Sequence, residues 1–169
     1  DPSTGTIYAL PSFGRGAWEN VAELDTGTTT HVAFILADDS SPFDTDDFGA
    51  GANEDAGTDA EAAPLFLYVG EKDAASDDIL ARNGLDGGKL FVWVADTEGT
   101  DSPLEFRGTG NAEGGTWVEI DNSQNLAMAS NDGSTGFDKY GYPTQRTLWE
   151  RAEAEGAFGF SRPEDVATN

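Results

Sequence analysis

Four side chains carry the chemistry that the sequence suggests most directly. Glu19 lies within the segment Trp18–Leu24, and Arg162 comes shortly before Glu164 and Asp165. Carboxylates gathered in a dry pocket repel one another, so they stay ionised only with cations between them. Such oxygen ligands favour calcium, magnesium, manganese or iron, and a guanidinium group fits the oxygens of a phosphate. The alternative, that these acids belong to an ordinary solvated surface, stays open in so acidic a chain.

Two other motifs resemble binding loops without completing them. The segment Gly14-Arg-Gly-Ala-Trp-Glu begins like a dinucleotide fingerprint, but Glu19 stands where the third glycine belongs and no helix is expected to follow. The spacing of acids from Asp44 to Asp55 is similar to that of a calcium loop, although Phe48 replaces one oxygen ligand. We therefore expect a solvated loop there, with loose calcium binding as the alternative.

The single histidine, His31, follows three threonines at the start of an apolar run. A catalytic triad would need a nucleophile beside it, and no Gly-x-Ser-x-Gly motif accompanies it. The pattern favours an ordinary histidine at the end of a strand.

The composition narrows the classes of partner. Aspartate and glutamate number 32 against 9 lysines and arginines, which gives a formal charge of -23. Such a chain repels polyanions, so we expect neither nucleic acid nor anionic membranes as partners. The absence of cysteine excludes disulfides and thiolate chemistry from this sequence. No apolar run approaches the roughly 20 residues of a membrane span, and an opening Asp-Pro is compatible with the removal of a leader.

The elements expected to position these groups are mainly strands. Short apolar runs rich in β-branched and aromatic residues, bounded by Gly, Asp, Thr or Pro, predict strands. The strongest runs are Ile7–Leu10, Val32–Ala37, Leu65–Val69 and Leu90–Ala95, and weaker ones are Trp18–Leu24, Leu104–Arg107 and Trp117–Asp121. Because the middle runs are continuous, we expect them to be buried on both faces, as in stacked β-sheets.

One helix is predicted, over about 144–156. Thr144 fits its N-cap, Leu148, Trp149 and Ala152 share one face, and Gly156 fits its C-terminal stop. An acidic surface loop is expected over about 38–64, between two strands that would otherwise form a hairpin, and a second polar region runs over 122–141. The final residues resemble the start of a further loop-to-strand unit, so we expect the natural polypeptide to continue.

Several strings together resemble the PhoX-type alkaline phosphatase family of secreted bacterial proteins. They are Gly14-Arg-Gly-Ala-Trp-Glu-Asn-Val-Ala-Glu-Leu-Asp25, Pro64-Leu-Phe-Leu-Tyr-Val-Gly-Glu-Lys-Asp73, Leu80-Ala-Arg-Asn-Gly-Leu85, Gly88-Lys-Leu-Phe-Val-Trp-Val94 and Phe160-Ser-Arg-Pro-Glu-Asp165. The resemblance covers most of residues 14–165 apart from the acidic loop and the 122–141 region. It implies an all-β fold, with 1–169 forming about half of a six-bladed β-propeller.

The resemblance also implies a function and a set of site residues. Members of the family hydrolyse phosphate monoesters at a central site that holds calcium and iron, and they are secreted or periplasmic. By similarity, Glu19 and Glu164 would be metal ligands, with Asp165 a weaker candidate, and Arg162 would contact the substrate phosphate. Glu71 and Lys72 match the family string, but the resemblance assigns no catalytic role to them.

Two departures keep a second class of function open. Active phosphatases of this type hold iron with a cysteine, which this sequence lacks, and half a propeller cannot complete the pocket. The alternative is a calcium-stabilised extracellular propeller without catalysis, whose unpaired sheet edges mediate self-association or assembly.

Overall fold

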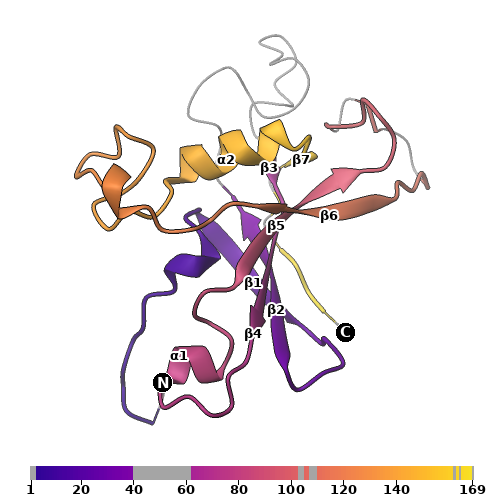
Figure 1. Cartoon of the computed structure of the whole chain (residues 1–169). Coiled ribbons are helices and arrows are strands. Elements are labelled where there is room, and N and C mark those ends of the chain that lie inside the picture. The colour runs from indigo at the N-terminus through magenta and orange to yellow at the C-terminus, as the bar shows by residue number, and fades with distance from the viewer. Residues whose placement is uncertain are drawn as a thin grey trace.

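The computed structural model of the chain describes residues 3–39, 62–102, 105–106, 110–161, 163 and 165–168 (Figure 1). Strands make up most of its regular structure, joined by two α-helices and two short 3₁₀ helices. In chain order the elements are η1 (Pro11–Phe13), β1 (Trp18–Leu24), β2 (His31–Asp38), β3 (Ala62–Pro64), β4 (Phe66–Glu71), α1 (Ile79–Arg82), β5 (Lys89–Ala95), β6 (Gly115–Ile120), η2 (Leu126–Met128), α2 (Gln145–Ala154) and β7 (Gly159–Ser161).

The main sheet has five antiparallel strands in the order β1-β2-β4-β5-β6, and β3 pairs with β7 in a separate two-stranded sheet. Strands adjacent in this main sheet follow one another along the chain apart from the short excursion through β3, so the sheet is a meander. This confirms an all-β architecture and the predicted pairing of the strands on either side of the acidic loop. The described residues do not close into a ring.

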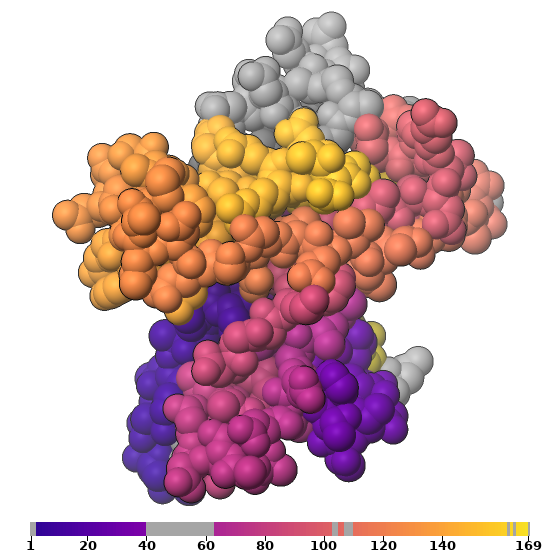
Figure 2. All heavy atoms as spheres, viewed as in Figure 1, coloured from indigo at the N-terminus to yellow at the C-terminus, as the bar shows by residue number. Residues whose placement is uncertain are grey.

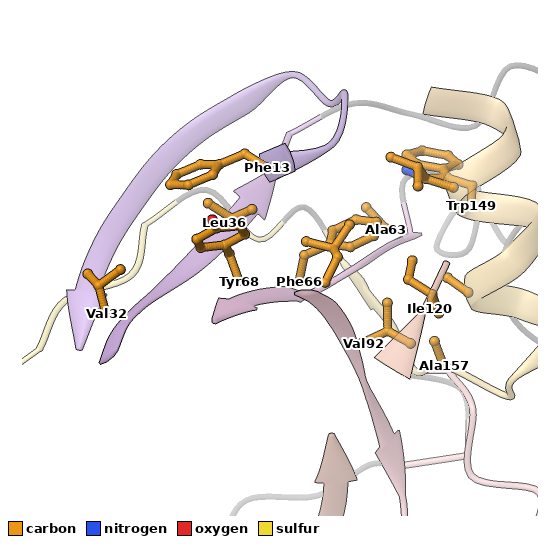
Figure 3. Close-up of a cluster of buried hydrophobic side chains, with 13 residues drawn as sticks. Phe13, Val32, Leu36, Ala63, Phe66, Tyr68, Val92, Ile120, Trp149 and Ala157 are labelled. Atoms are coloured by element: carbon orange, nitrogen blue, oxygen red, sulfur yellow. The ribbon is translucent and has the colours of Figure 1, made fainter. Parts of the chain in front are cut away.

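Cross-strand register places the large apolar side chains on one face of this sheet. Leu36, Phe66 and Val92 form one row across β2, β4 and β5. Phe34, Tyr68, Leu90 and Ile120 form the next row. Phe13 from η1 and three residues of α2 cover this face, as Figure 3 shows for Phe13 and Trp149. The buried residues of this cluster are Phe13, Val32, Leu36, Ala63, Phe66, Tyr68, Leu90, Val92, Ile120, Leu148, Trp149, Ala152 and Ala157.

Burial on both faces is confirmed for β2 and is wrong for β4 and β5. In β2, Ala33 and Ile35 on the second face are buried as well as Val32 and Leu36 on the first. In β4 burial alternates along the strand, and in β5 only Leu90 and Val92 are buried. The continuous apolar runs of β4 and β5 therefore leave a second, partly exposed apolar face on the sheet.

Helix α2 confirms the predicted helix, including its signals at both ends. The side chain of Thr144 accepts a hydrogen bond from the Thr147 N–H, as an N-cap does. Leu148, Trp149 and Ala152 are buried against the sheet. Gly156 lies just beyond the last turn with φ of 75°, a conformation that favours glycine. In Figure 2 this yellow helix lies across the upper half of the molecule, above β6.

Three expectations need correction. Residues 7–10 form no strand, and Ile7 is 95% exposed. Within the expected strand 104–107, Glu105 and Phe106 lie in a turn and a bend, and residues 104 and 107 lie outside the described residues. Of the expected loop 38–64, Asp38 ends β2 and residues 62–64 form β3, while 40–61 lie outside the described residues.

The Tyr-Val-Gly-Glu-Lys string has a packing role in this fold. Tyr68 is fully buried, its hydroxyl donates to the carbonyl of Gly84 at 2.9 Å, and it accepts from the N–H of Gly88 at 3.2 Å. Two residues along β4, a Cβ on Gly70 would lie 1.8 Å from the carbonyl oxygen of Gly84. The α1–β5 connection therefore rests directly on the backbone of β4.

Replacing Tyr68 with phenylalanine is expected to lower the free energy of unfolding by about 1–2 kcal/mol, because both hydrogen bonds are lost while the ring stays. Burial also raises the pKa of this hydroxyl above its ordinary value of 10.0, more than its hydrogen bonds to Ser12 and Gly88 lower it. The folded chain thus holds the proton more tightly than the unfolded chain, and stability is lost as the pH rises through about 10. Urea denaturation from pH 8 to 11 should show this loss in the native chain and a smaller loss in Tyr68→Phe.

Candidate functional site

A cleft of about 1040 Å³ is lined in part by residues of the first string of the resemblance. Its walls come from the N-terminal segment, the start of β1, the turn at residues 132–133 and the first residues of α2. In Figure 2 the indigo N-terminal segment borders the orange segment that precedes α2. The lining residues are Tyr8, Leu10, Phe13, Gly14, Arg15, Gly16, Trp18, Val21, Asp132, Gly133, Thr144, Gln145 and Arg146.

The loop between η1 and β1 presents Arg15 to this cleft. Gly14 ends η1 with φ of 77°, and its N–H donates to the carbonyl of Pro11. A Cβ at Gly14 would lie 2.8 Å from a methyl carbon of Leu148. The first glycine of the Gly-Arg-Gly motif therefore lets the loop reverse direction while packing closely on α2, which is a structural role rather than nucleotide binding.

The carboxylate of Asp38 links the end of β2 to the segment before β1 and to the first turns of α2. Asp38 is fully buried at the end of β2. It accepts hydrogen bonds from the N–H of Ala17 at 3.0 Å, from the side-chain amide of Gln145 at 2.9 Å and from the indole N–H of Trp149 at 3.2 Å. Buried carboxylates are costly unless they are hydrogen-bonded in this way. Asp38 thus fixes the loop after η1 against the first turns of α2.

Arg15 forms an ion pair with Asp138 at the edge of the cleft. The side chain of Asp138 is only 10% exposed, whereas that of Arg15 is 53% exposed. Burial acts to raise the pKa of Asp138, but the N–H groups of Tyr142 and Tyr140 and the Arg15 guanidinium outweigh it, and the pKa lies below its ordinary value. Asp138 is therefore ionised near neutral pH and orients a guanidinium whose other face meets solvent.

A second arginine, Arg146, also lines the cleft. Arg146 is exposed on the first turn of α2, where backbone N–H groups also favour anions. Asp132 supplies one carboxylate, and its hydrogen bonds with Ser134 hold its pKa below the ordinary value. Two of the nine basic residues of a chain with charge -23 thus border one cleft, an arrangement suited to holding a phosphate.

The four predicted site residues are only partly placed by this structure. Glu19 is exposed on β1 and does not line the cleft, and Asp165 is exposed near the C-terminus. Arg162 and Glu164 lie outside the described residues. The hydroxyl of Thr168 donates to the carbonyl of Glu23 at 2.9 Å. The C-terminal segment that carries Asp165 therefore runs against the strand that carries Glu19.

The described residues do not by themselves form a metal site. Among them, no three histidine, aspartate or glutamate side chains gather closely enough to hold an ion. Calcium takes six to eight oxygen ligands, and Glu19 and Asp165 would provide only part of such a set.

Two remaining motifs were His31 and the acidic spacing from Asp44 to Asp55. His31 is exposed at the first residue of β2, with its Nδ1 atom 2.9 Å from the hydroxyl of Thr30, as expected for a histidine at a strand end. The calcium-like spacing from Asp44 to Asp55 lies outside the described residues. No helix in the described part of the chain is long and apolar enough to cross a membrane.

Sequence reasoning missed Asp38, Asp138 and Arg146 as parts of a site. Only Asp38 had a local signal, because an acid that directly follows a buried apolar run needs hydrogen-bond partners if its side chain is buried.

Comparison with known proteins adds no assignment: no family model, no curated protein and no solved structure matches the chain.

Proposed function

We propose that this chain is part of a secreted or periplasmic, metal-dependent phosphoesterase of the PhoX type, and that the cleft beside Arg15 and Arg146 receives the phosphate group of a monoester. The observation that carries the proposal is the pair of guanidinium groups at one cleft, in a protein whose net charge otherwise repels phosphate. The cleft is also built from the first of the strings on which the resemblance depends.

Two further features support the finer parts of this proposal. A meander of antiparallel strands is the unit from which propeller blades are made. The hydroxyl of Thr168 contacts the backbone of Glu23 near the end of β1, so the last described residues of the chain reach the strand that carries Glu19. By the resemblance, Glu19, Glu164 and Asp165 would hold calcium, with iron as a second ion, and Arg162 would contact the phosphate. Because Glu19 does not line the cleft, this metal centre would lie beside the cleft rather than within it.

The expected activity is hydrolysis of p-nitrophenyl phosphate by the full-length protein, lost on treatment with EDTA and restored by calcium or iron. Arg15→Ala and Arg146→Ala should each raise KM by roughly tenfold to a hundredfold, because each removes a charge-assisted hydrogen bond to the phosphate. Arg82→Ala is the matched control, since it removes the same charge from the exposed helix α1. Steady-state kinetics with melting temperatures for each variant would make the comparison.

The same experiment separates the possible outcomes. A native protein without metal-dependent turnover would contradict the enzymatic proposal. Turnover that is unchanged in both arginine variants would place the phosphate elsewhere. Thermal stability that falls with EDTA, without any turnover, would favour a calcium-stabilised structural protein.

The high negative charge of the chain favours the alternative of a calcium-stabilised structural protein. A charge of -23 destabilises a compact state by self-repulsion, and bound cations relieve that repulsion. Among the described strands, β6 is an edge of the main sheet, with β5 as its partner on one side only. Such an edge is a template for pairing with another chain, so self-association would accompany this function.

A further inference from the structure

A second pocket, of about 470 Å³, lies on the sheet away from the Arg15 cleft and is dominated by aromatic rings. We call it the aromatic pocket. Its walls come from β5, β6, β7 and the segments beside them, and its size is within the usual range for small-molecule sites. The lining residues are Leu65, Trp93, Phe106, Asn111, Ala112, Glu113, Trp117, Phe158 and Phe160.

Three of the five aromatic rings that line this pocket pack against one another. Trp93 contacts Phe158 and Phe160 with ring centroids 5.6 and 5.7 Å apart, and those two phenylalanines lie 4.8 Å apart. Trp117 on β6 is the direct cross-strand partner of Trp93 on β5. The pocket is therefore lined by aromatic rings, three of which, Trp93, Phe158 and Phe160, are packed against one another.

Gly115 helps to place the Trp93 indole. A Cβ at Gly115 would lie 2.1 Å from the indole ring, so the ring lies directly over the glycine backbone. Only glycine at this position of β6 leaves that space to the ring. The pairing of β5 with β6 and the glycine at position 115 thus fix the position of the Trp93 indole.

Among the described residues that line the pocket, the charged side chain is a carboxylate. Glu113 lies on its wall, and one carboxylate oxygen accepts a hydrogen bond from the N–H of Thr97 at 3.0 Å, which holds the side chain in place. None of the described residues that line the pocket is a lysine or an arginine. The chain as a whole carries a charge of -23, which raises the local concentration of cations.

We propose that the aromatic pocket binds a small organic cation with a methylated ammonium group. Indole and phenyl faces attract such a cation through their quadrupoles, and a nearby carboxylate adds a full charge. A methylated ammonium group has an apolar surface that packs against rings, unlike a strongly hydrated metal ion. This site is separate from the phosphate cleft. The proposal does not depend on whether the chain hydrolyses phosphate esters.

The test compares a cation with its neutral isostere on the full-length protein. Choline should bind with affinity at least about tenfold higher than 3,3-dimethyl-1-butanol, in which carbon replaces the charged nitrogen, because cation–π and carboxylate attraction act on the charge alone. Isothermal titration gives both affinities. Indole N–H signals in NMR spectra, assigned with Trp117→Phe, should shift for Trp93 and Trp117 only.

Two variants make the result specific. Trp117→Ala should weaken choline binding about tenfold or more, and Glu113→Gln, which keeps the side-chain shape, should weaken it severalfold. Glu98→Gln is the matched control, because it removes the same charge from an exposed position nearby. Circular dichroism of each variant tests whether it is folded. If Trp117→Ala does not fold, the choline affinity of Glu113→Gln tests the proposal instead.

Equal affinity for the neutral isostere would overturn the proposal and mark the pocket as a plain apolar surface. Absence of choline binding at millimolar concentrations would also overturn it, and would point to packing by another sheet or protein segment. Choline binding that is unchanged in both Trp117→Ala and Glu113→Gln would place the cation elsewhere.

Discussion

Replacing Gly70 with alanine is expected to remove most or all of the stability of the fold. The added methyl group would lie 1.8 Å from the carbonyl oxygen of Gly84, 2.8 Å from the Gly84 carbonyl carbon and 3.0 Å from the Tyr68 hydroxyl. Its nearest neighbours are backbone atoms, so no side-chain rotation relieves the overlap. Separating β4 from the α1–β5 connection would break the Tyr68–Gly84 hydrogen bond. We expect a loss of at least about 3–5 kcal/mol, comparable with the whole stability of many domains.

The control for this prediction is Gly27→Ala. A Cβ at Gly27 meets nothing within 4 Å, so that variant carries only the strain of φ near 65°, about 1 kcal/mol. Thermal melts and yields of soluble protein for the two variants would make the comparison. A Gly70→Ala protein that melts as high as the Gly27→Ala protein would show that the close approach is not needed for folding.

Replacing Asp38 with alanine is the second change with a large expected effect. It removes the common acceptor of the hydrogen bonds from Ala17, Gln145 and Trp149 and leaves a cavity where a carboxylate was fully buried. We expect the free energy of unfolding to fall by about 3 kcal/mol. Because Asp38 fixes the Arg15 loop against α2, phosphate-ester binding should weaken in the same variant. Chemical denaturation and KM measure the two effects.

Asp77→Ala is the control for the Asp38 prediction. Asp77 is exposed, so its replacement removes one negative charge without disturbing a buried group, and stability should change by less than about 0.5 kcal/mol. Equal stabilities for the two variants would mean that the Asp38 carboxylate is not a structural link. A destabilised Asp38→Ala protein with unchanged KM would mean that the cleft does not depend on it.

The regular elements could be predicted from sequence where burial and local signals agree. The runs of β2, β4 and β5 are apolar and β-branched or aromatic, and each lies within a residue or two of its predicted place. Residues 7–10 have the same composition, but Pro11 follows and lacks the N–H that a strand needs, and η1 begins there. A strand also needs a partner, which composition does not reveal.

The cleft could not be predicted because long-range packing assembles it. Arg15 and Asp138 are 123 positions apart, and Asp38 and Gln145 are 107 positions apart. No periodicity in the segment 122–141 indicates that it approaches the N-terminal loop. The glycine motif at Gly14 has a packing role in the structure, because a Cβ there would lie 2.8 Å from a methyl carbon of Leu148.

The order of the strands has a consequence for biosynthesis. The meander is complete once Ile120 has left the ribosome, since each of its pairings joins segments already made. The apolar face that carries Phe66 and Leu90 is covered in part by Phe13, which is made earlier, and in part by α2, which is made later. Until α2 is made, a nascent chain therefore carries a paired sheet with part of its apolar face exposed to solvent. That interval is when molecular chaperones would be most needed.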